Sequence, residues 1–183
     1  MMTPAEYIQL KAFARVDGLT LSLLWTAAFA CTVVGLSKPM YSMIAMTLLA
    51  ATPIYVGYRL KRFRDEDRGG IISLMRGWAF SILVFFYGGI LLAVVQYIYL
   101  AFMDHGYLLM SLKRMLDSPE GKLMVEQYGM AESLEQSLSN LEQLRPIDFA
   151  LNMLTMNISA GIILGLPIAA ILKKNEKSEK LER

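Results

Sequence analysis

The chain has 183 residues, of which 55% are hydrophobic, and its formal net charge is +2. Its mean hydropathy of +0.43 is too high for an ordinary soluble domain, and its length excludes two large domains. Length and composition therefore indicate one compact membrane domain.

Four long apolar runs dominate the sequence, at residues 18–37, 40–58, 71–103 and 147–172. A hydrocarbon core of about 30 Å needs roughly 20 helical residues, and only helices or closed barrels satisfy their backbone polar groups there. These runs lack the alternation of barrel strands. We therefore predict an all-α integral membrane bundle of four transmembrane helices at about 18–37, 40–58, 77–102 and 147–172. The third run is longer than a bilayer needs, and we place its division at Arg76-Gly77.

The N-terminus contains the capping sequence Thr3-Pro4-Ala5-Glu6. It predicts a short interfacial helix that ends near Arg15 and lies along the inner membrane surface, before Asp17-Gly18 turns the chain into the first span. The alternative is a signal peptide cleaved after Ala28-Phe29-Ala30. Because the apolar run continues beyond this sequence, a retained span is favoured.

Lysine and arginine gather on alternate ends of the four runs. Since cytoplasmic connections retain positive residues, both termini should be cytoplasmic, including the tail 173–183, and the segment 104–146 should be extracytoplasmic. These features are typical of a multi-pass membrane protein. The basic connection after the second span should also attract anionic lipid, whereas nucleic acid is an improbable ligand for such a short tethered loop. Its first residues are Arg59, Lys61, Arg62 and Arg64.

The extracytoplasmic segment between the third and fourth spans is predicted to form an amphipathic helical hairpin. Pro119 and Gly121 divide it into a helix over 107–117 and a second over about 122–144, with a potential break at Gly129. Three leucines of the second helix share one face, at i, i+4 and i+7. This face either packs within the hairpin and on lipid headgroups, or docks another membrane protein or a second copy. The leucines are Leu134, Leu138 and Leu141.

Three sequences resemble a bacterial membrane family called domain of unknown function 4199 (DUF4199). They are Arg68-Gly69-Gly70-Ile71-Ile72 before the third span, Tyr128-Gly129-Met130-Ala131-Glu132-Ser133-Leu134-Glu135 in the outer segment, and Ala169-Ala170-Ile171-Leu172-Lys173-Lys174 after the fourth. The resemblance covers most of the chain. It implies a four-span inner-membrane protein and brings no catalytic residues with it.

Polar residues inside lipid are costly, so they are candidates for function. On the fourth span, polar side chains at i, i+4, i+7 and i+11 share one face, and Gln96 of the third span should lie at the depth of Asn152. We predict that these two side chains meet, as an interhelical hydrogen bond or as the lining of a polar cavity. The polar face of the fourth span comprises Asp148, Asn152, Thr155 and Ser159.

Small residues predict close helix packing at two places. Gly89 and Ala93 share a face of the third span with Gln96, and Gly161, Gly165 and Ala169 have a small-xxx-small spacing on the fourth. Pro167 is expected to bend the inner end of the fourth span.

Reactive groups are scarce. His105 is the single histidine and Cys31 the single cysteine, so one chain assembles neither a histidine metal cluster nor a Cys/His pair. We expect no catalytic residues, metal or cofactor. The sequence favours a non-enzymatic accessory, scaffold or assembly subunit. The alternatives are a small oligomeric channel or carrier lined by the polar stripe and, less favoured, a membrane enzyme that uses Asp104, His105 and Asp148.

Overall fold

The computed structural model describes residues 3–129 and 131–174, and most of these residues are helical. Most of the predicted tail 173–183 therefore lies outside the described residues. Within them, four helices are long and apolar enough to cross a membrane, which confirms the predicted fold class. They are Pro4–Gly35, Pro39–Asp67, Leu74–Phe102 and Pro146–Leu172.

The predicted interfacial helix and the predicted first span form one continuous helix, because α1 runs without a break from Pro4 to Gly35. Its capping box is present: the Thr3 hydroxyl accepts from the Glu6 amide at 3.3 Å, and the Glu6 carboxylate accepts from the Thr3 amide at 2.8 Å. The predicted turn at Asp17-Gly18 is wrong. Both residues are buried in the helix, where Asp17 binds Arg59 and Gly18 lies against α4.

The second span consists of α2 (Pro39–Ala50), α3 (Thr52–Arg62) and a π-helical turn, η1 (Phe63–Asp67). Pro53 separates α2 from α3, since proline provides no backbone donor and disturbs the preceding helical turn. The Trp25 indole fixes this junction by donating to the Thr52 hydroxyl at 2.9 Å.

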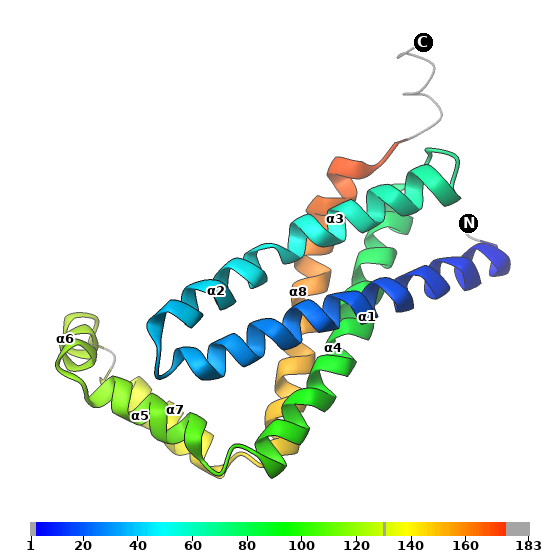
Figure 1. Cartoon of the computed structure of the whole chain (residues 1–183). Helices are drawn as coiled ribbons and strands as arrows, with labels where there is room; N and C mark the ends of the chain where they lie inside the picture. Colours follow the sequence, from blue (N-terminus) through cyan, green and yellow to red (C-terminus); the bar gives the residue numbers. More distant parts are fainter. Residues whose placement is uncertain (1–2, 130, 175–183) are drawn as a thin grey trace.

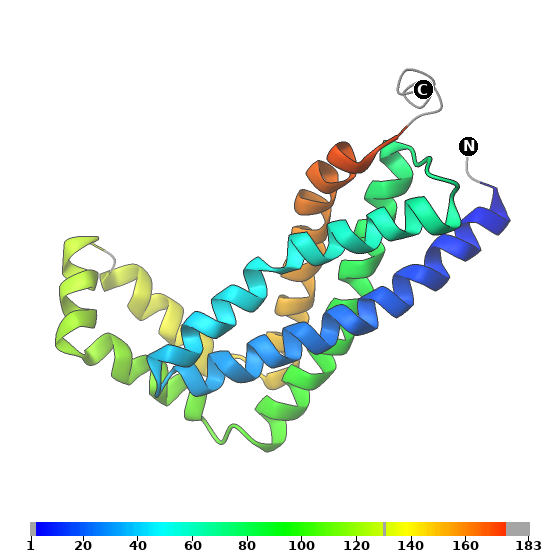
Figure 2. The ribbon, with the colours of Figure 1, turned by 45° about the horizontal axis from the view of Figure 1, so that its top comes forward.

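The third and fourth spans, α4 (Leu74–Phe102) and α8 (Pro146–Leu172), pack antiparallel along most of their length (Figure 2). The predicted small face of α8 forms this contact: an added Cβ on Gly161 would lie 2.6 Å from the Phe85 Cβ, and one on Gly165 would lie 2.9 Å from the Ser81 Cβ. Close backbone approach is therefore confirmed. Near Pro167, the Trp78 indole donates to the Ile162 carbonyl at 3.0 Å.

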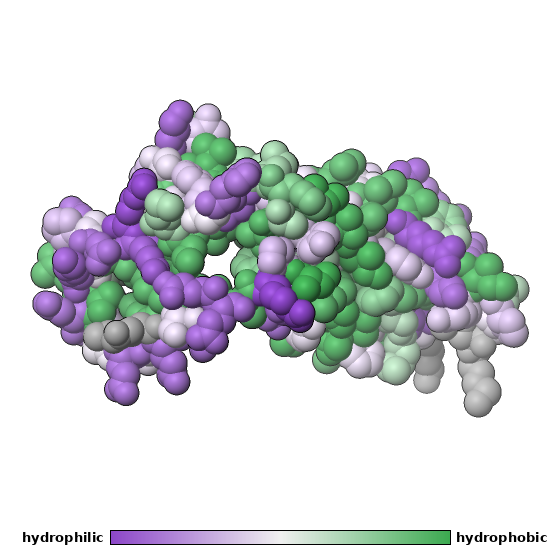
Figure 3. Space-filling model, turned by 90° about the horizontal axis from the view of Figure 1, so that it is seen from below, coloured by the Kyte–Doolittle hydropathy of each residue, from purple (hydrophilic) through white to green (hydrophobic). Residues whose placement is uncertain are grey.

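The outer segment forms three helices, α5 (Tyr107–Asp117), α6 (Pro119–Gln127) and α7 (Ala131–Gln143). The boundaries of α5 are those predicted, and the break at Gly129 is confirmed by its left-handed φ of 62°. The three helices lie at the end of the bundle opposite to the start of α1 and the end of α8 (Figure 1). Hydrophilic surface gathers over them, whereas the bundle is largely hydrophobic (Figure 3).

At the other end, a short backbone pairing joins the lead-in to α4 to the end of α8. The Ile72 amide donates to the Lys174 carbonyl at 3.0 Å, and the Lys174 amide donates to the Ile72 carbonyl at 3.1 Å. This pairing holds the start of α4 beside the end of α8.

Candidate functional site

The polar stripe of α8 lies on the outside of the bundle. Asn152, Thr155 and Ser159 are all exposed, on the face of α8 opposite to the one that packs against α4. The Thr155 hydroxyl donates to the Leu151 carbonyl at 3.0 Å within its own helix, which satisfies one donor only. The stripe therefore presents hydrogen-bonding groups to whatever surrounds the bundle.

The predicted contact between Gln96 and Asn152 is wrong, because one side chain lies inside the bundle and the other lies on its exterior. Gln96 is buried at 5% exposure, whereas Asn152 is exposed. A polar residue of α8 that does face α4 is Asn157, whose Cβ lies 3.3 Å from the position of a Cβ added to Gly89. Asn157 follows the same spacing of four residues as Gly161 and Gly165, so the small-residue pattern already contained the signal for it.

Asp148, the first member of the stripe, makes a local interaction at the start of α8. The Arg145 guanidinium donates to both carboxylate oxygens of Asp148, from Nε at 2.8 Å and from Nη2 at 2.9 Å. Asp148 thus anchors the connection from α7 to α8 and is not part of a buried cluster.

A cavity of about 520 Å³ lies between α1, α2, the start of α3, α4, α5 and α8. It is mainly apolar, and its lining among the described residues contains no ionisable side chain. Two amide side chains, Gln96 and Asn157, reach it from α4 and α8. The Gln96 side-chain oxygen is buried and accepts no hydrogen bond from any described residue.

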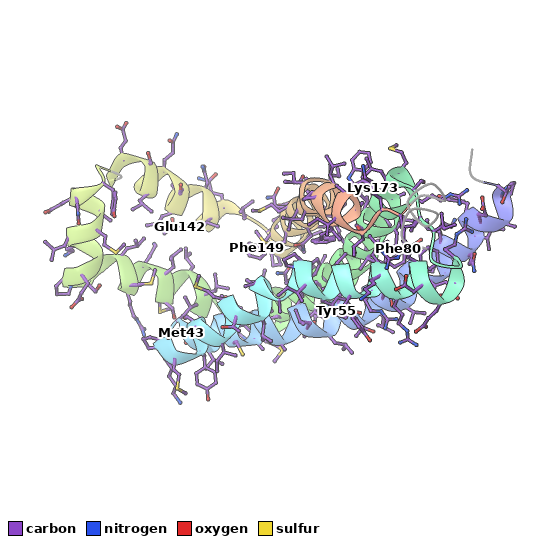
Figure 4. The ribbon with its side chains drawn as sticks, turned by 90° about the horizontal axis from the view of Figure 1, so that it is seen from above. Met43, Tyr55, Phe80, Glu142, Phe149 and Lys173 are labelled. Carbon is purple, nitrogen blue, oxygen red and sulfur yellow. The ribbon has the colours of Figure 1, made fainter. Side chains whose placement is uncertain are left out.

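The shape of the bundle explains this cavity. α3 packs against α8, whereas α2 diverges from α8 toward the outer helices (Figure 1). Pro53 lies at the point of divergence and lines the cavity, and Leu108 of α5 lines its outer end. Phe149, another lining residue, lies in the first turn of α8, on the side toward the outer helices (Figure 4).

The leucine stripe of α7 is turned toward the other outer helices. Leu134 and Leu138 are half-buried and share a groove with Leu116 of α5 and Val125 of α6. Leu141 is also half-buried and lies in a second groove with residues of α5. An ion pair between Lys113 and Glu142 joins the same helices. This placement favours packing within the hairpin over the alternative of a free docking face.

A buried ion pair that the sequence analysis missed joins α1 to α3. The Asp17 side chain is 2% exposed and pairs with Arg59, whose side chain is 22% exposed and whose Nε donates to the carboxylate at 2.6 Å. The Tyr55 hydroxyl also donates to the Asp17 carbonyl at 3.1 Å. Asp17 and Arg59 are 42 residues apart, so no local pattern indicated their contact.

Arginines of the basic connection after the second span make interactions within the chain. Besides Arg59, Arg62 pairs with Glu66, and Arg64 pairs with Asp65 and donates to the Leu172 carbonyl at 3.0 Å. These contacts reduce the positive charge that the cluster offers to an anionic lipid. Lys61 is exposed on the same segment.

Glu6 binds two further arginines, Arg68 of the connection and Arg76 in the first turn of α4. Its carboxylate accepts from Arg68 at 2.7 Å and from Arg76 at 2.8 Å. These two ion pairs hold the start of α1 against the segment before α4 and against the first turn of α4.

The candidate catalytic groups have local structural contacts. The Asp104 carboxylate accepts from the Leu108 amide at 3.1 Å and so caps α5, while the His105 ring nitrogen Nδ1 lies 2.9 Å from the Met103 carbonyl. Asp148 binds Arg145, as described above. No group of three or more His, Cys, Asp or Glu residues that could hold a metal occurs within residues 3–129 and 131–174.

Comparison with known proteins finds a family model described as "Protein of unknown function (DUF4199)", which matches residues 17–174. The match includes all four candidate spans in whole or in part, together with the outer helices. Comparisons with curated proteins and with solved structures found no match.

Proposed function

Because the chain belongs to the DUF4199 family, whose function is unknown, we propose its role from the geometry: a non-enzymatic membrane subunit that associates through the exposed face of α8. The observation that carries this proposal is the outward position of Asn152, Thr155 and Ser159. Lipid tails offer these groups no hydrogen bonds, whereas a neighbouring helix does. A second copy is the simplest partner, since identical stripes related by a two-fold axis pair polar groups with polar groups.

The same proposal places the protein in the bacterial inner membrane, with both termini in the cytoplasm and α5–α7 outside. The distribution of lysine and arginine supports this orientation. The end of the bundle that holds Glu6, Arg68 and Arg76 would then face the cytoplasm.

Photo-crosslinking in native membranes tests the association. With p-benzoylphenylalanine in place of Ser159, we expect a crosslinked product larger than the free chain by 20.6 kDa, the mass of a second copy. The matched control replaces Leu23, which is 65% exposed on α1, away from the stripe. A product of another mass identifies a different partner, and labelling no stronger than at Leu23 contradicts the proposal.

Asn152→Leu should weaken the association about three- to thirtyfold, because interhelical polar contacts in membranes contribute about 0.6–2 kcal/mol. Sedimentation or single-molecule pull-down of the purified protein at several protein-to-detergent ratios measures this change. Leu23→Ala, on the exposed face of α1, is the control variant. An unchanged dissociation constant for Asn152→Leu would show that the stripe is not the contact surface.

A small oligomeric channel or carrier is the second candidate, and the outward stripe also favours it. Several copies around an axis would direct their stripes at a shared path lined by uncharged polar groups. In proteoliposomes, the double substitution Asn152→Leu, Thr155→Leu should then abolish solute flux without lowering the amount of inserted protein. If the unmodified protein shows no flux and the double variant loses its association, the result supports the subunit role instead.

A further inference from the structure

The cavity between α2 and α8 has the properties of a binding site for an uncharged lipid. Its volume of about 520 Å³ lies in the range of ligand pockets, about 300–1,000 Å³. It lies in the half of the bundle that adjoins α5–α7, between helices long and apolar enough to cross a membrane. Leu49 of α2 and Met156 of α8 line the cavity and are also exposed on the surface, so a molecule dissolved in the bilayer can enter between these helices.

The polar groups of the cavity define the chemistry of the ligand. The Gln96 oxygen is buried and lacks a donor among the described residues, which is costly in an apolar site. A glutamine amide both accepts and donates, so a hydroxyl group satisfies it in either orientation. With no ionisable side chain among the described lining residues, a phosphate or ammonium group would be desolvated there without a counter-charge.

We propose that this cavity binds a neutral hydroxyl-bearing lipid of the diacylglycerol class, with the hydroxyl at Gln96 and an alkyl chain along the apolar wall. Met153 and Ala160 of α8 and Phe85 of α4 supply that wall. The site is separate from the proposed association face, because Asn152, Thr155 and Ser159 do not line the cavity. An experiment can therefore contradict lipid binding in the cavity without contradicting association through α8, and the reverse.

Fluorescence quenching by brominated lipids tests this site directly. Trp25 lines the cavity and is 4% exposed, and Trp78 is the single other tryptophan of the chain. In a Trp78→Phe background in nanodiscs, a few mole per cent of brominated diacylglycerol should quench Trp25 with saturation, whereas brominated phosphatidylcholine at the same fraction should not. Equal quenching by both lipids would overturn the proposal, since it indicates filling by bulk acyl chains.

Two substitutions distinguish the site from its surroundings. Gln96→Leu should weaken diacylglycerol binding about three- to tenfold through loss of one hydrogen bond, and Ala160→Phe should abolish binding by filling the cavity. Ala170→Phe, on an exposed position of the same helix, is the control and should bind normally. Gln96→Leu removes an unsatisfied buried polar group, so its melting temperature should be unchanged or higher. Normal binding by Gln96→Leu or Ala160→Phe would contradict the assignment.

Discussion

Replacing Arg59 with methionine should lower the free energy of unfolding by about 3–5 kcal/mol, because it leaves the buried Asp17 carboxylate without its counter-charge. The Asp17 side chain is 2% exposed, so its carboxylate is almost fully removed from water in the folded protein. For a chain of this size, each kcal/mol corresponds to about 2–4 °C in melting temperature. Thermal unfolding of the purified protein in one detergent, followed by circular dichroism, measures the loss.

The comparison variants separate burial from charge. Arg62→Met removes an ion pair whose side chains are 49% and 58% exposed, and it should cost far less stability than Arg59→Met, because solvent screens exposed charges. Asp17→Leu combined with Arg59→Met should recover most of the stability lost by Arg59→Met, since no charge is then left buried. Equal losses for Arg59→Met and Arg62→Met, or no recovery in the double variant, would contradict the proposed role of the pair.

The contact between Asp17 and Arg59 could not be predicted from the sequence, whereas the spans and helix breaks could. Hydropathy locates the four spans because a helix in lipid must be apolar and continuous, and Pro119 and Gly129 mark breaks that depend on local backbone geometry. The partner of Asp17 depends on how α1 and α3 pack, which no short pattern records. The sequence therefore predicts a turn at Asp17, although this residue is buried within the unbroken helix α1.

The polar residues of α8 show a second limit. In a soluble helix the polar face marks solvent, but in a membrane helix lipid is as apolar as leucine, so a polar stripe does not tell which face is inside. Asn152 was expected inside and is exposed, while Asn157 faces Gly89. The small residues were the better guide, since close backbone approach depends directly on their size. They place Gly161 and Gly165 against α4.

Because α4 and α8 approach so closely, Gly161→Ala should destabilise the protein by about 1–3 kcal/mol, the usual cost of overpacking. The added Cβ would lie 2.6 Å from the Phe85 Cβ and 2.8 Å from its Cγ, and both atoms are close to the α4 backbone and cannot move aside freely. The matched control is Gly57→Ala in α3, whose added Cβ would have its nearest neighbour at 3.8 Å. That variant should be neutral or more stable by up to about 1 kcal/mol, because alanine favours helix.

A compensating exchange makes the contact itself testable. Gly165→Ala places a Cβ 2.9 Å from the Ser81 Cβ, so Ser81→Gly removes the atom it meets. The two substitutions together should be less destabilising than the sum of the two alone by about 0.5–3 kcal/mol, the range of coupling between residues in contact. Additive losses in melting temperature would mean that α8 does not pack on α4 through these positions. Measured coupling would establish that α4 and α8 are in direct contact at these positions, which directs the opposite face of α8, with its polar stripe, away from α4.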